Sequence, residues 1–197
     1  MINQIVKLKE NDAMYKKITD EIANATDDDL IIVARSYKNR KDDAVKPIVI
    51  KNGIYFYVAY ELSGKLAFLG KVTPEQINKA KGNMAAKAVI GTNFDMIFGN
   101  GTPFAEWEYD GQPMNVAALE TKMNGSGLLY CEEFLREIKG KMGDFYILPS
   151  SIHELIFVSK DFGSKEDLTE MVCEVNAAEV SDDDYLADRA FEVEEWI

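Results

Sequence analysis

The chain has a single histidine, His153, and this limits the kinds of catalytic site that it could form. A Ser-His-Asp or Cys-His system would have to be built around it, and a zinc site with two or more histidines is excluded. The pair His153-Glu154 begins like the metalloprotease motif H-E-x-x-H, but Phe157 stands where the second histidine should be. We therefore expect no catalytic residues, no metal and no other cofactor, and the sequence favours a protein that is not an enzyme.

The polar run after Pro149 is the best candidate for a binding site, and it contains Ser150, Ser151, His153 and Glu154. If the chain is extended here, neighbouring side chains point to opposite faces, so the histidine and the glutamate do not form an acid–base pair. The alternative is a structural role. The hydroxyls would then satisfy backbone groups of a turn, and a backbone group or a carboxylate would hold the imidazole.

A short glycine motif, Gly125-Ser126-Gly127, resembles the centre of a nucleophile elbow. Asn124 stands where the pattern G-x-S-x-G needs its first glycine, so the resemblance fails. The position of Ser126 before a predicted helix favours a helix cap instead.

The two cysteines, Cys131 and Cys173, lie beside the apolar stripes of predicted helices. Small apolar-like thiols are commonly buried at such positions, so we expect two buried free cysteines. Nothing in the sequence indicates a disulfide between them.

Acidic residues outnumber basic ones by 34 to 22, which gives a net charge of −12. Phosphate backbones are bound by lysine and arginine, so nucleic acid is not an expected partner. Half of this charge lies in residues 181–197, where seven acids face Arg189 alone. No run approaches the ~20 apolar residues of a membrane span, and the first residues do not form a signal peptide. We expect a cytoplasmic protein that does not bind membranes.

The first half of the chain predicts a helix in residues 1–25, a buried strand over 30–34 and a β-hairpin turning at Asn52-Gly53. Thr73 and Gln76 form a capping box for a helix that we expect to break before Gly82. The second half predicts a helix from residue 128, strands over 145–148 and 155–158, a helix from Ser164 and an edge strand over 189–196.

These elements predict an α+β fold in which a mostly antiparallel or mixed sheet of about six or seven strands is covered by helices. A hairpin bracketed by helices favours antiparallel pairing over a βαβ array. We expect a single domain over 1–197, with a subdivision near 120–127 into parts 1–120 and 125–197 as the alternative.

The run from Asp144 to Glu154, D-F-Y-I-L-P-S-S-I-H-E, resembles an uncharacterised family of bacterial proteins, mostly from Gram-positive gut anaerobes. Met171-Val172 and Glu174-Val175-Asn176, followed by the acidic stretch, extend the resemblance over residues 125–197. The family is a domain of unknown function, so the resemblance implies no reaction. It does draw attention to the segment from Pro149 to Glu154.

Three functions remain open at the level of sequence. The favoured one is a non-catalytic intracellular binding module that contacts a protein partner, as indicated by the acidic tail and the tyrosine-rich strand at Ile54–Tyr60. The second is binding of a small ligand near Ser150–Glu154. The third is an enzyme with an unfamiliar site.

Overall fold

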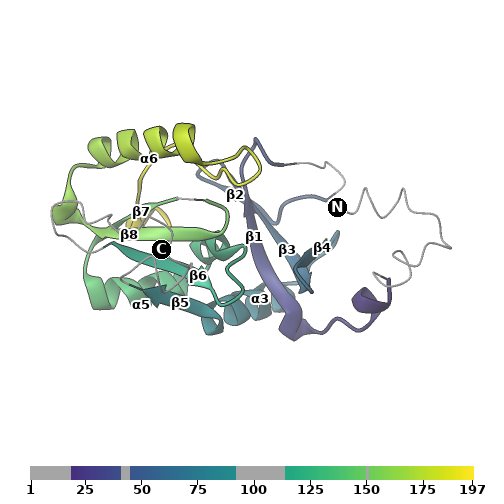
Figure 1. Ribbon diagram of the computed structural model, residues 1–197. Coiled ribbons are helices and arrows are strands. Elements are labelled where there is room, and N and C mark those ends of the chain that lie inside the picture. Colours follow the sequence, from purple (N-terminus) through teal and green to yellow (C-terminus); the bar gives the residue numbers. More distant parts are fainter. Residues whose placement is uncertain (1–18, 41–44, 92–113, 150) are drawn as a thin grey trace.

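The computed structural model describes residues 19–40, 45–91, 114–149 and 151–197, which form two antiparallel β-sheets and their covering helices (Figure 1). The first sheet contains β1 (Leu30–Arg35), β2 (Val49–Lys51), β3 (Ile54–Leu62) and β4 (Lys65–Phe68). The second, in the order β5-β6-β8-β7-β9, contains β5 (Ala88–Gly91), β6 (Asn115–Leu119), β7 (Phe145–Leu148), β8 (Glu154–Ser159) and β9 (Phe191–Glu192). The predicted α+β class is confirmed, although the strands divide between two sheets.

The hairpin between β2 and β3 turns at Asn52-Gly53, as the sequence predicts. Both residues have positive φ, 54° and 79°, which a type I′ turn requires and which this pair tolerates best. A second turn with positive φ at both positions, Ser63-Gly64, returns the chain from β3 into β4. Strand β3 is therefore the centre of its sheet, with β1 along one edge and both β2 and β4 along the other.

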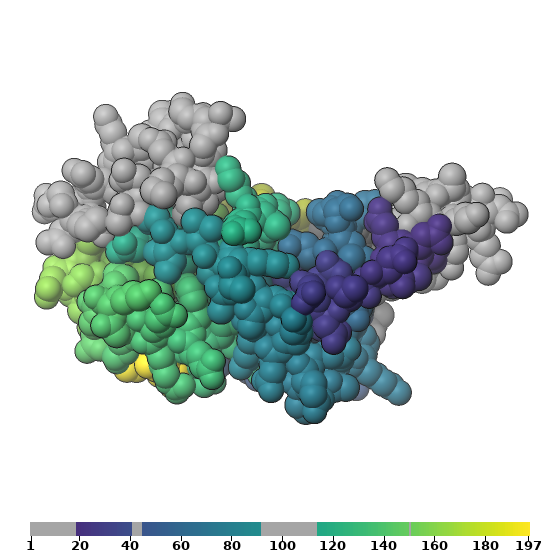
Figure 2. Space-filling model, turned by 90° about the horizontal axis from the view of Figure 1, so that it is seen from below, coloured from purple at the N-terminus to yellow at the C-terminus, as the bar shows by residue number. Residues whose placement is uncertain are grey.

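Successive side chains of each strand in the second sheet point to opposite faces, and both faces are covered. One face packs on α6 (Lys165–Glu179), where Leu148 and Val158 contact Leu168 and Val172. The other face joins the main apolar core, to which both sheets contribute. The helices α3 (Pro74–Ala86) and α5 (Glu132–Met142) lie on the opposite side of the molecule from α6, and Figure 2 shows them together on one face.

Helix α3 begins with the predicted capping box. The Thr73 hydroxyl accepts a hydrogen bond from the Gln76 backbone N–H, and the Gln76 side chain accepts one from the Thr73 backbone. The expected break before Gly82 is wrong, because the helix continues without interruption to residue 86. An interior glycine costs a helix about 1 kcal/mol, and burial of Ala80 and Met84 against the core offsets this cost.

The 3-10 helix η2 (Gly125–Tyr130) lies between the two sheets and contacts β1 on one side and β6 and β8 on the other. Such close contact requires glycine. A Cβ on Gly125 would overlap the carbonyl oxygen of His153, and one on Gly127 would overlap that of Ile32. The glycines of the G-S-G motif therefore let η2 join the sheets.

Ser126 does not cap a helix, so the sequence-based interpretation is wrong. It lies inside η2, and its hydroxyl donates a hydrogen bond to the carbonyl oxygen of Ile152 at 2.7 Å. The backbone N–H of Gly125 likewise donates to the His153 carbonyl at 2.9 Å. These bonds fix the loop that precedes β8.

The two cysteines differ in their exposure to solvent. Cys131 is buried at the start of α5, as predicted, and burial raises the pKa of its thiol to about 12. Cys173 is exposed on α6, so its predicted burial is wrong. Both thiols are free.

The C-terminal edge strand is shorter than predicted. Only Phe191–Glu192 pairs with β7, and the chain then forms the 3-10 helix η4 (Val193–Glu195) and buries Trp196. Most of the helix predicted for residues 1–25 lies outside the described part, although residues 19–23 are helical. Among the described helices, none combines the length and the apolarity needed to cross a bilayer.

Candidate functional site

A pocket of about 470 Å³ opens beside the first sheet, where its walls come from segments far apart in the sequence. They include the end of β1, the strands β3 and β4, the loops before η2 and β8, and the turn after α6. The volume falls within the range of about 300–1,000 Å³ that is typical of small-ligand sites. The lining residues are Arg35, Asn39, Arg40, Val45, Tyr57, Gly64, Leu66, Phe68, Met123, Asn124, Ile152, His153, Asp183 and Asp184.

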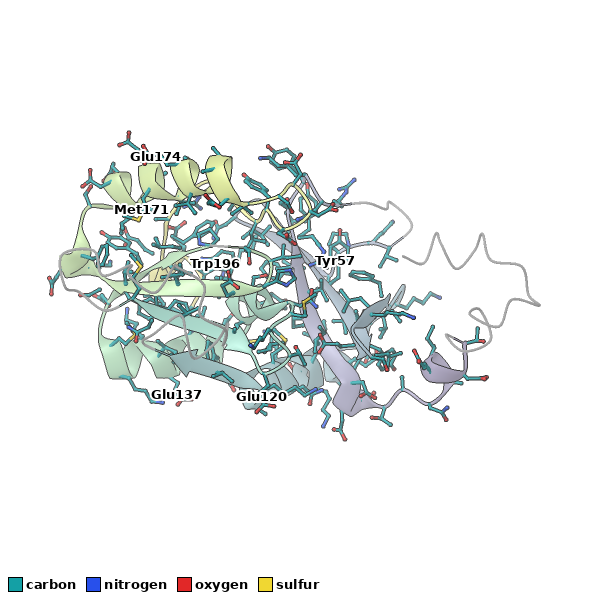
Figure 3. The ribbon with its side chains drawn as sticks, viewed as in Figure 1. Tyr57, Glu120, Glu137, Met171, Glu174 and Trp196 are labelled. Atoms are coloured by element: carbon teal, nitrogen blue, oxygen red, sulfur yellow. The ribbon has the colours of Figure 1, made fainter. Side chains whose placement is uncertain are left out.

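Arg35 is the last residue of β1 and is partly buried at the pocket wall. In the antiparallel register it lies opposite Tyr55, so its side chain shares a face of the sheet with the diagonal neighbour Tyr57, which Figure 3 labels. Its guanidinium donates to the Ala34 carbonyl at 2.8 Å and to Oδ1 of Asn124 at 3.3 and 3.4 Å. Arg35 forms no ion pair with a carboxylate of the described residues.

Burial lowers the pKa of Arg35 to about 10, although Tyr57 and Asp184 act in the opposite direction. The guanidinium is thus still cationic at neutral pH, but it has lost part of its hydration. A buried cation whose hydrogen-bond acceptors are all uncharged oxygens gains from any anion brought close to it.

Asn124 connects this arginine to the histidine. It has a left-handed backbone conformation, with φ 59° and ψ 20°, which asparagine tolerates better than most residues. Its side-chain oxygen accepts from Arg35, and its backbone N–H donates to Nδ1 of His153 at 3.3 Å.

His153 uses both ring nitrogens within the protein. Because Nδ1 accepts a hydrogen bond from the Asn124 backbone, the proton of the neutral ring is on Nε2. Nε2 lies 3.2 Å from Oδ1 of Asp184 and donates to it. With neither nitrogen available to a reacting atom, the imidazole is suited to holding loops and lining a pocket, and poorly suited to proton transfer.

The turn after α6 is held in place by side chains from the first half of the chain. Asn39 donates from Nδ2 to the carbonyl oxygens of Asp183 and Tyr185, at 3.0 and 2.6 Å. The carboxylate of Asp184 accepts from His153 and, through Oδ2, from the Ser181 hydroxyl at 2.9 Å. This turn therefore brings acidic groups to the same pocket as Arg35.

The rest of the wall is mainly apolar. Phe68 packs edge-on against Tyr57, with ring centroids 5.6 Å apart. Leu66 and Met123 extend the apolar surface, and the exposed Met123 lies at the edge. A pocket with a few convergent polar groups and an apolar remainder is typical of sites for small molecules.

The four site residues suggested by the sequence have different surroundings. His153 lines the pocket, whereas Ser151 and Glu154 are buried and do not line it. The Ser151 hydroxyl accepts from the His153 backbone N–H at 2.9 Å, as in a polar turn. Ser150 lies outside the described residues. The binding role of these residues remains a prediction.

Sequence reasoning missed Arg35, Asn124 and Asp184 as members of a common site. A signal existed for Arg35, because a charged residue directly ends a fully buried apolar strand. The other two carried no comparable signal, since a loop asparagine and one aspartate of an acidic run are usually solvated. Among the described residues, no three histidine, cysteine or acidic side chains are arranged to hold a metal ion.

The structure defines an α+β protein with a mixed-charge pocket beside the junction of two antiparallel sheets. The chain belongs to a family of unknown function, DUF5688, whose model matches residues 66–193. The expectation of an uncharacterised family is confirmed, and the match begins well before residue 125. It includes Asn124, His153 and Asp184 but not Arg35. No curated protein and no solved structure matches the chain.

Proposed function

We propose that this protein binds a small organic molecule in the pocket beside β1, and that Arg35 binds an anionic group of the ligand. The observation that carries the proposal is the position of this guanidinium at the wall of a largely apolar pocket, without a carboxylate partner among the described residues.

The hydrogen bonds of Arg35 leave room for such a group. A guanidinium has five N–H donors in a fixed plane. The bonds that Arg35 forms go to two neutral acceptors, the Ala34 carbonyl and the Asn124 amide oxygen. A carboxylate from a ligand would add charge-assisted hydrogen bonds, which are about twice as strong as neutral ones.

The protein-interaction module favoured by the sequence has less support. The acidic tail and the tyrosine-rich strand, which suggested it, both make contacts within the chain. The acidic tail pairs internally, since Glu192, Glu194 and Glu195 contact lysines and an arginine of the same chain. The tyrosine-rich strand β3 is not an exposed aromatic surface. Its Tyr57 is buried and its Tyr55 lies under Arg40.

The proposal is for binding without catalysis. Both nitrogens of the single histidine are engaged within the protein, which supports a positioning role for His153. As part of the proposal we place the protein in the bacterial cytoplasm, as the sequence predicts.

The test is isothermal titration of the protein with isocaproate, an apolar carboxylate, and with inorganic phosphate as a comparison. We expect isocaproate to bind, and Arg35→Met to weaken it by at least about tenfold, since a charge-assisted hydrogen bond contributes roughly 1.5–3 kcal/mol. Methionine keeps the apolar stem of the arginine.

The matched control is Arg136→Met, on the exposed face of α5, where the arginine pairs with Glu132 at 3.8 Å and does not line the pocket. It should leave isocaproate binding unchanged. The proposal is wrong if isocaproate does not bind, or if both variants, each checked for folding by thermal denaturation, weaken it equally.

A further inference from the structure

Two groups of opposite charge, Arg35 and Asp184, face the same pocket without pairing with each other. Arg35 and Arg40 contribute two positive charges, and Asp183 and Asp184 contribute two negative ones, so the formal charges of the wall cancel. Arg35 and Asp184 attract each other electrostatically, yet no ion pair forms between them. A pocket of this kind favours neither a dianion nor a dication, because each would meet like charge within it.

The separation between Arg35 and Asp184 is maintained by a chain of hydrogen bonds. The guanidinium donates to the Asn124 side chain, the Asn124 backbone donates to His153, and His153 donates to the Asp184 carboxylate. Each charged group is therefore held by neutral neighbours at its own place on the wall. A ligand that carries both an anionic and a cationic group on one carbon atom can interact with both.

Resting on the function proposed above, we propose that the ligand is a free α-amino acid with an apolar side chain. Its carboxylate binds Arg35, its ammonium group binds Asp184, and its side chain contacts Leu66, Phe68 and Met123.

Asp184 has the capacity for this second interaction. A carboxylate offers about four acceptor positions, and the bonds from His153 and Ser181 occupy one on each oxygen. The Asp184 side chain is 45% exposed, so its remaining positions are open to a donor in the pocket. An ammonium group has three donors and no acceptor, which matches this carboxylate.

The apolar part of the wall fits the third group of such a ligand. Val45, Leu66, Phe68 and Met123 provide aliphatic and aromatic surface beyond the charged groups. A polar or charged side chain placed there would lose its hydration without a partner. Leucine and phenylalanine are therefore better candidates than glutamate or lysine.

The experiment compares L-leucine with two analogues that each lack one charged group, isocaproate and isoamylamine, by isothermal titration of the full chain. We expect leucine to bind at least about tenfold more tightly than isocaproate and isoamylamine to bind weakest, because each charge-assisted interaction is worth about one power of ten or more.

The variant Asp184→Asn should remove the advantage of leucine over isocaproate, while isocaproate, which no longer meets a like charge there, should bind at least as tightly as to the wild type, which also shows that the pocket is intact. The control is Asp182→Asn, whose side chain is 88% exposed and does not line the pocket. It should leave both affinities unchanged.

The possible failures are distinguishable. If isocaproate binds as tightly as leucine, the amino-acid inference is wrong and the proposed anion site stands. If neither compound binds, the proposed function fails together with the inference. Because the comparison of analogues uses the wild-type chain, the inference can be refuted even if a variant does not fold.

Discussion

Trp196 is the largest fully buried side chain among the described residues, and it lies between elements from both halves of the chain. Its ring, labelled in Figure 3, packs edge-on against Phe56 of the first sheet and Phe191 of the second, at centroid distances of 6.0 and 5.2 Å. The Lys51 ammonium donates to its backbone carbonyl at 2.9 Å. The indole N–H, in contrast, has no hydrogen-bond partner among the described residues.

From this arrangement we expect two substitutions of Trp196 to differ strongly in their effect on the free energy of unfolding. Trp196→Ala should lower the free energy of unfolding by about 3–5 kcal/mol, because it leaves a cavity between the sheets. Trp196→Phe should cost less than about 2 kcal/mol, because the smaller ring also removes an unsatisfied buried donor, which is itself unfavourable by about 1–3 kcal/mol. Urea unfolding of both variants measures the difference. Equal losses would show that the N–H has a partner or that the whole ring is required.

At the scale of elements, η2 determines how the two sheets meet. It contacts β1, β6 and β8, and its bonds to residues 152 and 153 fix the loop that carries the histidine into the pocket. A short helix can approach two sheets this closely only where side chains are absent from the contact.

We therefore expect Gly127→Ala to lower the free energy of unfolding by about 1–3 kcal/mol or more, because the new methyl group overlaps the Ile32 carbonyl, which belongs to a rigid strand. The control is Gly140→Ala in α5, where the surrounding space is open. It should stabilise the protein by about 0.5–1 kcal/mol, since alanine is the better helix former. Thermal and urea unfolding test the pair, and a neutral Gly127→Ala would refute the role assigned to η2.

At the scale of the whole molecule, the C-terminal acidic residues hold the ends of several elements together. Glu195 accepts hydrogen bonds from Lys165 at the start of α6, from Arg189 and from the backbone of Glu192, at 2.7–2.9 Å. Burial alone would raise the pKa of Glu195, but these bonds outweigh it and lower the pKa to about 2.

Because the pKa of Glu195 is lower in the folded chain than its ordinary value near 4.5, the carboxylate stabilises the fold above that value. This contribution is lost as the pH falls from about 4.5 towards 2. Glu195→Gln should reduce the free energy of unfolding at neutral pH by up to about 3 kcal/mol, and its difference from wild type should vanish near pH 2.

Glu174→Gln, on the exposed face of α6 (Figure 3), is the control and should have little effect at any pH. Chemical unfolding across the pH range measures both variants. A difference between Glu195→Gln and wild type that stays constant down to pH 2 would contradict this role.

The sequence alone determined the local features of this protein. The Asn52-Gly53 turn, the Thr73 capping box and the apolar strands around Ile32 and Phe157 follow from the conformational preferences of a few adjacent residues, and they appear in the structure as predicted. The α+β class follows from the order of these elements. The sequence also directed attention to His153, which does line a pocket.

Only the tertiary structure decided which residues share that pocket. Arg35 and Asn124 are 89 positions apart in the chain, and Asn39 reaches Tyr185 across 146 positions. Such pairings depend on how two sheets pack around η2, and no local preference encodes them. The same packing also determines the partners of the carboxylates in the acidic tail. Its charge indicated an external partner, but folding brings lysines and an arginine to its carboxylates, because internal pairing satisfies them within the molecule.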